Sequence, residues 1–268
     1  MEPLNRPAAV REQYRTADKL STRISIHDKY SVNRQGFHPW IASHYRIPEG
    51  AALLELGCGT GSPWKGQEGI IRKCARFVLS DLSEGMLEKA KETLKDVPGI
   101  EYRLIDITDI PFSDESFDAV IANMMLYHVP DLDGALREVR RVLKKDGSFY
   151  CATYGENGMT AYLAGLFKEY PVDGRLNDTF TLENGEAILR RHFSEVQRLL
   201  YEDALAVTDV DDMVDYIFSL SGFSALRRLP RKTVRSVLEA HKTHGILQVP
   251  KEYGLFIARG KGEELIPR

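Results

Sequence analysis

The chain has 268 residues, of which 43% are hydrophobic and 28% are charged. Its 36 lysines and arginines against 39 aspartates and glutamates give a net charge of −3, which disfavours a disordered chain, a collagen-like chain and a general polyanion binder. This length allows one large domain or two small ones, with a core that needs no disulfide or metal for its stability.

The three cysteines, Cys58, Cys74 and Cys151, form no CxxC pair and have no spacing typical of a metal site. We therefore expect no metal ligation and a reducing compartment. The N-terminus lacks the apolar core of a signal peptide, and the most apolar stretch, residues 119–129, is too short to cross a membrane. These features predict a cytoplasmic protein without a membrane partner.

The chain divides into four predicted regions. We expect residues 1–46 to form an N-terminal helical arm or lid and residues 47–154 to form the core of the fold. Residues 155–180 are a helical cap insertion, and residues 181–268 complete the core. A second helical cap insertion is predicted within this last region, at 209–248.

In the core, short apolar runs alternate with patterns of helical period. Strands are predicted at 51–56, 75–80, 100–106, 118–124 and 148–154, with later strands at 194–205 and 253–260. Two amphipathic helices are predicted to begin after the N-caps Ser83 and Asp131. This alternation predicts an α/β fold with a parallel sheet that is covered by helices on both faces.

The strongest motif is LLELGCGTG at residues 53–61, in which Gly57, Gly59 and Gly61 follow the end of a strand. Glycine tolerates positive φ and has no Cβ, so a tight turn can bring backbone amides against a nucleotide-like ligand. A dinucleotide-binding GxGxxG loop would require glycine at position 62, where Ser62 stands. Gly66 and Gly69 predict that the helix after this loop is short or irregular.

Asp81 follows Gly61 by 20 residues, at the end of the next strand, where a carboxylate can accept both hydroxyl protons of a ribose. This pattern, with Glu55 before the glycines, resembles motif I and the following acidic loop of the class I S-adenosylmethionine-dependent methyltransferases. The resemblance covers about 100 consecutive residues. It implies a doubly wound, Rossmann-like, seven-stranded and mostly parallel sheet, with the last strand antiparallel, and S-adenosyl-L-methionine as the cofactor.

The resemblance also implies roles for single residues. Asp81 would hold the ribose hydroxyls, Asp106 would meet the adenine amino group, and Glu55 would support the amino acid end of the cofactor. The other implied cofactor contacts are Gly57, Cys58, Gly59, Gly61, Leu82, Ile107, Asn123 and Met124.

The candidates for the acceptor side are Tyr14, Arg23, Tyr127 and Tyr154. Arg23 suits the cofactor's carboxylate, because the guanidinium is a fixed bidentate donor. His128 follows the fourth strand, near the reacting methyl group, and is the candidate general base. His128 could instead have a packing role, and we expect this structural role rather than the catalytic one.

The sequence thus predicts an enzyme that transfers a methyl group to a small organic molecule by in-line displacement, with no nucleic acid partner. An RNA or protein methyltransferase and a non-catalytic adenosyl-ligand-binding protein are the alternatives. Residues 122–125 lack the Asn/Asp-Pro-Pro-aromatic motif of some adenine-N6 enzymes, which disfavours a nucleic acid substrate. The basic run at 227–235 is either a phosphate-contacting patch or, as we expect, a solvated helix face.

Overall fold

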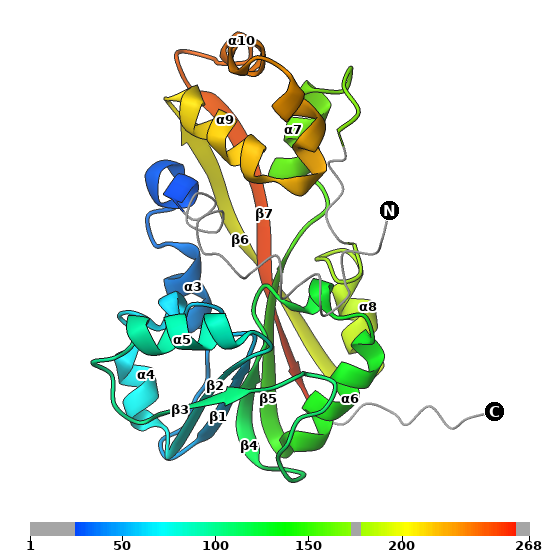
Figure 1. Ribbon diagram of the computed structural model, residues 1–268. Coiled ribbons are helices and arrows are strands. Elements are labelled where there is room, and N and C mark those ends of the chain that lie inside the picture. The colour runs from blue at the N-terminus through cyan, green and yellow to red at the C-terminus, as the bar shows by residue number, and fades with distance from the viewer. Residues whose placement is uncertain (1–24, 173–177, 261–268) are drawn as a thin grey trace, which may run out of the picture.

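The computed structural model describes residues 25–172 and 178–260. Its centre is a seven-stranded sheet of order β3-β2-β1-β4-β5-β7-β6 (Figure 1). The strands are β1 (Ala52–Leu56), β2 (Arg76–Asp81), β3 (Ile100–Leu104), β4 (Phe117–Ile121), β5 (Leu143–Tyr154), β6 (Glu195–Val207) and β7 (Leu247–Arg259). Strands β1 to β5 pair in parallel, and β7 is antiparallel to both β5 and β6. The predicted doubly wound, mostly parallel sheet is confirmed.

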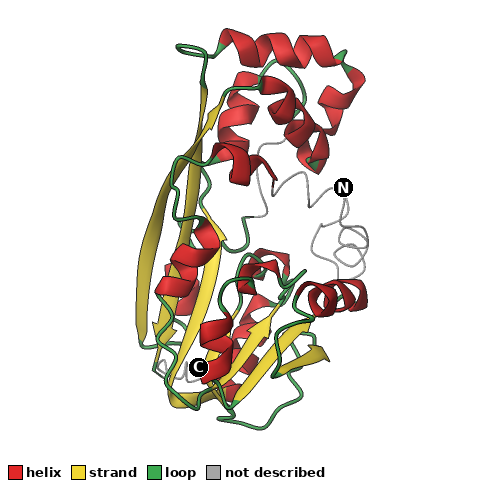
Figure 2. Ribbon diagram, turned by 90° about the vertical axis from the view of Figure 1, so that its left-hand side faces the viewer, coloured by secondary structure: helices red, strands yellow, loops and turns green. Residues whose placement is uncertain are grey.

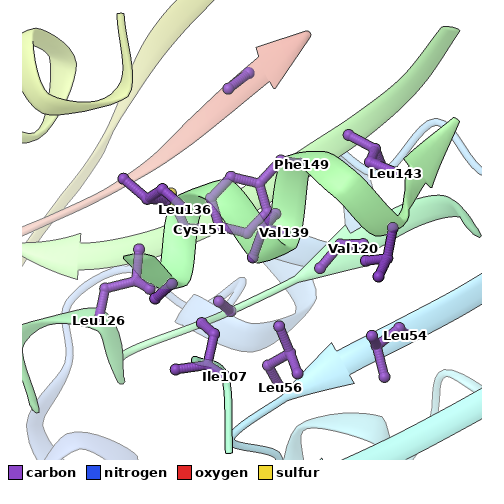
Figure 3. Close-up of a cluster of buried hydrophobic side chains, with 14 of the residues drawn as sticks. Leu54, Leu56, Ile107, Val120, Leu126, Leu136, Val139, Leu143, Phe149 and Cys151 are labelled. Carbon is purple, nitrogen blue, oxygen red and sulfur yellow. The ribbon is translucent and has the colours of Figure 1, made fainter. Parts of the chain in front are cut away.

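Helices cover both faces of the sheet. On one face, α6 (Leu132–Val142) packs Leu136 and Val139 into a core that contains Phe149 and Val120 (Figure 3); α8 (Gly185–Leu189) adds to this core. On the other face lie α3 (Phe37–Ser43), α4 (Glu68–Lys73) and α5 (Glu84–Thr93). Because both faces are covered, the last eight residues of β5 are all buried.

The predicted helix starts are confirmed. The Ser83 hydroxyl accepts a hydrogen bond from the amide of Met86 and caps α5. The Asp131 carboxylate accepts one from the amide of Gly134 and caps α6. Each cap satisfies an amide that the first helical turn leaves without a partner.

The hairpin of β6 and β7 is longer than the rest of the sheet. The two strands pair from Glu195 and Arg259 to Val207 and Leu247, whereas β5 pairs with β7 only as far as Tyr253. Beyond that point the hairpin continues as a two-stranded ribbon, which runs up to the cap helices in Figure 2.

The ribbon carries a cap with its own core. Its elements are α7 (Met159–Leu166), α9 (Val210–Ser219), the 3₁₀ helix η3 (Ser221–Arg228), α10 (Arg231–Ala240) and the helical residues 25–30. They bury an apolar cluster that includes Met213, Ile217, Phe223 and Leu238. This cluster is separate from the two clusters that lie against the sheet.

The last strand starts at Leu247, six residues before its predicted start. Pro250 lies in this added part and pairs with Ala204 of β6. Proline has no N–H to donate and is normally confined to strand edges. It is accommodated here because β5 has already ended, so β7 needs a strand partner on one side only.

No helix within residues 25–172 and 178–260 is both long and apolar enough to cross a membrane.

Candidate functional site

The glycine loop follows β1 at the carboxyl end of the sheet. Gly57, Gly59 and Gly61 adopt φ angles of 72°, 56° and 70°, the left-handed region that favours glycine. The amide of Cys58 donates to the carbonyl of Ser80 at 2.8 Å, which ties the loop to β2. The turn expected from the motif is therefore formed.

The three glycines differ in what surrounds them. A Cβ on Gly57 would lie 2.9 Å from Cγ of Met125, and one on Gly61 would lie 3.0 Å from Cδ1 of Leu94. A Cβ on Gly59 would meet no atom within 4 Å. Gly57 and Gly61 thus allow close packing inside the protein, whereas Gly59 borders open space.

The Asp81 carboxylate joins the loop to α5. One oxygen accepts from the amide of Gly59 at 2.9 Å, and the other accepts from the amide of Ser83 at 2.9 Å. Burial raises the pKa of Asp81, and these backbone donors oppose that rise. Each carboxylate oxygen has a second acceptor site, so a ligand's hydroxyl groups can still be bound.

Glu55 in β1 is only 3% exposed. One of its carboxylate oxygens accepts from Nε1 of Trp64 at 2.5 Å. Burial raises the pKa of Glu55 to about 7, although the Trp64 hydrogen bond opposes this rise. A buried carboxylate with such a pKa is typical of a functional site, and a ligand's ammonium group would favour its ionised form.

Trp64 reaches Glu55 because the segment after the glycine loop is irregular. Ser62–Trp64 form a 3₁₀ turn, η1, and α4 begins only at Glu68. Between them Gly66 has φ +79°. The predicted interruption of this helix is confirmed.

A pocket lies beside Glu55, between α3 and η1. Across it, Nδ2 of Asn123 donates to the hydroxyl of Tyr45 at 2.7 Å, and Oδ1 of Asn123 accepts from the amide of Ala152 at 3.1 Å. Its lining residues are His38, Ile41, Ala42, Tyr45, Glu55, Pro63, Trp64, Gln67 and Asn123. Of these, only Glu55 and Asn123 were predicted as site residues.

Asp106 follows β3, the strand that pairs with β2 and therefore with Asp81. Asp81 pairs with Leu104 across β2 and β3, and its carbonyl accepts from the amide of Ile105. One carboxylate oxygen of Asp106 accepts from the amide and the hydroxyl of Thr108. Asp106 therefore also stabilises the turn that follows β3.

The remaining predicted cofactor contacts are near these groups but differ in exposure. Leu82 follows Asp81 and is half-buried. The Cys58 and Ile107 side chains are buried in the cores on opposite faces of the sheet. Met124 has φ +54° and donates its amide to the carbonyl of Ala152.

The predicted acceptor-side residues are partly brought together. The ring centroids of Tyr127 and Tyr154 are 4.5 Å apart, as are those of Tyr127 and His128. Tyr127 and His128 belong to η2 (Leu126–His128), which follows β4. Tyr14 and Arg23 lie outside the described residues.

The three cysteines are free thiols. Cys58 and Cys151 are buried, and burial raises the pKa of both thiols well above its usual value. Within the described ranges no three His, Cys, Asp or Glu side chains are grouped so that they could hold a metal ion.

Comparison with known proteins gives one family match and several relatives. Residues 54–151 match the family model of a methyltransferase domain. The chain is 28% identical over 163 residues to the demethylmenaquinone methyltransferase of Staphylococcus carnosus, an alignment that covers 59% of this chain and 66% of that protein. It is also 28% identical over 193 residues to the ubiquinone/menaquinone biosynthesis C-methyltransferase UbiE of Escherichia coli, with coverages of 68% and 74%.

The chain spans only part of the length of several curated relatives. The share is 53% for a 37.1 kDa transposon protein of Streptomyces fradiae, 66% for the Staphylococcus carnosus enzyme and 32% for the human arginine-hydroxylase NDUFAF5. Among solved structures, the YcgJ protein of Bacillus subtilis has the same fold, with a TM-score of 0.57 at 17% identity over 84% of this chain and 98% of that chain. The matched domain runs from β1 into β5 and includes the glycine loop, Asp81 and Asp106. Residues 54–151 are therefore a methyltransferase domain, and they contain the motifs that resemble those of the class I S-adenosylmethionine-dependent methyltransferases.

Proposed function

We propose that this protein binds S-adenosyl-L-methionine and transfers its methyl group to a small organic molecule. The observation that carries the proposal is the Asp81 carboxylate, which is fixed by the amides of Gly59 and Ser83 beside the open space at Gly59. This arrangement suits a ribose diol next to a glycine turn.

The residues present fit the rest of the cofactor. The buried carboxylate of Glu55, in a pocket with Tyr45 and Asn123, suits the ammonium group of the methionine part. Asp106 and Leu82 suit the adenine, since they flank Asp81 at the ends of β2 and β3. When bound, the cofactor supplies a methyl group on a sulfonium, which is already an activated electrophile.

The chain's own residues would therefore act mainly by positioning. The glycine loop and Asp81 fix one reactant, while the aromatic residues Tyr127 and Tyr154 offer a surface for the other. Holding two reactants in line and away from water supplies much of the rate of such a transfer. His128, at the end of η2, remains our candidate for a base if the acceptor carries a proton of high pKa.

Two observations favour a small acceptor over a nucleic acid. The names of the Staphylococcus and Escherichia relatives refer to quinone biosynthesis. In the basic run, Arg231 pairs with Asp215, Arg235 pairs with Asp211, and Arg227 donates to the carbonyls of the cap. These partners support the interpretation of the run as a solvated helix face.

Calorimetric titration with S-adenosylhomocysteine tests the proposal. We expect binding below millimolar concentration, and we expect Asp81→Ala to weaken it at least about tenfold, because a charge-assisted hydrogen bond contributes about 1.5–3 kcal/mol. Asp96→Ala, at an exposed position after α5, is the matched control and should bind like the wild type.

Absence of binding in a folded wild-type protein would refute the cofactor assignment. A protein that binds S-adenosylhomocysteine is then incubated with labelled cofactor and metabolite extracts, and the products are identified by mass spectrometry. Label found only in RNA or protein would favour the alternative, macromolecular substrates.

A further inference from the structure

The ring of Trp64 is held in a fixed orientation. The residue is only 2% exposed, and its ring meets the ring of Phe77 in β2 edge-on, with the ring centroids 4.7 Å apart. The ring of Tyr45 lies nearly parallel to it, at a centroid distance of 6.2 Å. Because both neighbours restrict the plane of the indole ring, they also restrict the direction in which its N–H group can donate.

The acceptor of this N–H group is a carboxylate oxygen. Nε1 of Trp64 donates to Oε2 of Glu55 at 2.5 Å, and both residues line the pocket between α3 and η1. An ionised carboxylate has two oxygens with about four acceptor sites, so this hydrogen bond leaves sites for a ligand in the pocket. A donor that is itself fixed by packing holds the carboxylate in one orientation.

A carboxylate is a costly partner for a buried indole. A backbone carbonyl group would satisfy the same N–H group without placing a titratable side chain in the interior. Glu55 is 3% exposed, and burial disfavours the charged form of its carboxyl group. A buried carboxylate that lines a pocket and is oriented by a second side chain is typical of a ligand-binding site. The pair of Trp64 and Glu55 therefore points to a cationic ligand group in the pocket.

Other titratable groups lie around Glu55. Asp81 at the end of β2 raises the pKa of Glu55, although burial has the larger effect. Burial raises the pKa values of Cys58 and Tyr45 well above their usual values, so both stay protonated near pH 7. Desolvation lowers the pKa of His38, which also lines the pocket, so its ring is neutral there. A change of affinity near pH 7 can therefore be assigned to Glu55 by comparison with Glu55→Gln.

We propose that Trp64 is a positioning residue, whose indole N–H group orients the Glu55 carboxylate toward the ammonium group of the bound cofactor. This inference rests on the proposed function, because it concerns the methionine part of the same ligand. The ammonium group and the carboxylate then form a charge-assisted hydrogen bond inside the pocket, where solvent screens it little. Without the indole donor, the carboxylate can rotate and its ionised form is less favoured.

The test compares two ligands on the full chain by calorimetric titration. S-adenosylhomocysteine carries the amino acid part with its ammonium group, whereas 5′-methylthioadenosine is an adenosyl thioether without that part. The variants are Glu55→Gln, Trp64→Phe, which removes the donor and keeps an aromatic ring, and the double variant. The matched control is Trp40→Phe, at the other tryptophan of the chain, which is half-buried in α3 and is not among the residues that line the pocket.

We expect the wild type to bind S-adenosylhomocysteine more tightly than 5′-methylthioadenosine. Trp64→Phe should weaken S-adenosylhomocysteine about tenfold at pH 7 and leave 5′-methylthioadenosine within about twofold. The double variant should bind like Glu55→Gln, because the indole then has no carboxylate to orient. Trp40→Phe should change neither affinity. An equal loss for both ligands in Trp64→Phe would give Trp64 a purely structural role and overturn the inference.

The pH profile is a second readout. The affinity of the wild type for S-adenosylhomocysteine should rise by up to about tenfold from pH 6 to pH 8, because the pKa of Glu55 is about 7 and its ionised form binds the ammonium group. In Trp64→Phe the midpoint of this rise should move to higher pH, since the lost hydrogen bond lowers the pKa of Glu55. An unchanged midpoint would contradict the positioning role.

If Trp64→Phe does not fold, Trp40→Phe keeps the inference testable. Trp64 is then the single tryptophan, and its fluorescence should change with a midpoint near pH 7. The change should be absent when Glu55→Gln is added, and a fluorescence that is the same in both proteins across this range would overturn the inference. Failure of both ligands to bind refutes the proposed function, whereas equal affinity of the wild type for both ligands refutes the inference alone.

Discussion

Gly59 differs from the other loop glycines because its missing side chain leaves space that nothing in the protein fills. Gly59→Ala should therefore weaken S-adenosylhomocysteine binding at least about tenfold, through a methyl group in the ligand's space and a strained φ. The strain alone costs about 1–2 kcal/mol of stability. Calorimetry and thermal unfolding measure the two effects separately.

Gly50→Ala is a suitable control for this prediction. Gly50 has φ +76° and open space around it, but it lies in the turn before β1. The Gly50→Ala variant should lose a similar amount of stability and keep its affinity for S-adenosylhomocysteine. Equal losses of affinity in both variants would mean that backbone strain, not ligand contact, explains the effect of Gly59→Ala.

Glu55 makes stability depend on pH in a direction unusual for a carboxylate. Its pKa is raised from 4.5 to about 7 in the folded protein. The folded protein therefore binds the Glu55 proton more tightly than the unfolded chain does. The contribution of Glu55 to the free energy of unfolding is highest below pH 4.5 and falls by up to about 3 kcal/mol as the pH rises through 7. Relative to wild type, Glu55→Gln should thus gain stability between about pH 5 and pH 8.

Urea unfolding of both proteins across this range checks the effect, with Glu88→Gln at an exposed position of α5 as the control. If the stability difference between Glu55→Gln and the wild type does not change with pH, Glu55 does not titrate in this window.

The sequence identifies the residues that form a local motif, such as the glycines and Asp81. It does not identify Tyr45, whose hydroxyl meets Asn123 from 78 positions away. Trp64 gives a weak local signal, a single indole directly after the loop, but its contact with Glu55 depends on the irregular η1 segment. Contacts between distant parts of the chain leave no periodic pattern from which they could be predicted.

At the scale of elements, the long ribbon of β6 and β7 is held by the buried pair of Asp203 and Lys251. Ser31 donates its hydroxyl to Asp203, so the pair also joins the segment after the helical residues 25–30 to the ribbon. Asp203→Asn should cost about 3–5 kcal/mol of unfolding free energy, because it leaves a buried ammonium group without its counter-charge.

Asp215→Asn gives the comparison, since Asp215 pairs with Arg231 in the exposed part of the cap. It should cost less than about 1 kcal/mol. The double variant Asp203→Leu with Lys251→Met should recover much of the loss in chemical unfolding experiments. If Asp203→Asn were as stable as Asp215→Asn, the buried pair would not stabilise the ribbon.

The ribbon also contains the part of the sheet that the sequence pattern does not predict. The ends of β1 to β4 agree with the predicted ends to within three residues, whereas β5 begins at Leu143, five residues before its predicted start, in a polar stretch. The first part of β7 contains Pro250 and charged residues, and its strand structure depends on pairing with β6. Such pairing is a tertiary effect, which local propensity does not contain.

At the scale of the whole molecule, the cap and the sheet have separate apolar cores. Leu238→Ala in α10 should cost about 2–5 kcal/mol, because Leu238 is fully buried in the cap. It should leave S-adenosylhomocysteine affinity within about twofold, since none of the residues around the pocket beside Glu55 belongs to the cap helices α7, α9 or α10.

Ile41→Ala provides the contrast, because Ile41 is buried in α3 and lines that pocket. The affinity of the Ile41→Ala variant for S-adenosylhomocysteine should fall several-fold in the same titration. Hydrogen exchange would locate the loosened region in each variant. Loss of cofactor binding in Leu238→Ala would mean that the cap and the sheet unfold as one cooperative unit.

The ribbon also has an evolutionary consequence. Val207 and Leu247 are paired neighbours, so the cap segment between them leaves the ribbon and returns to it at the same place. A segment whose two ends meet can be lengthened, shortened or exchanged for another without changing the order of the strands. In this architecture the segment between Val207 and Leu247 can be replaced during evolution, while the order of the strands and the matched methyltransferase domain stay unchanged.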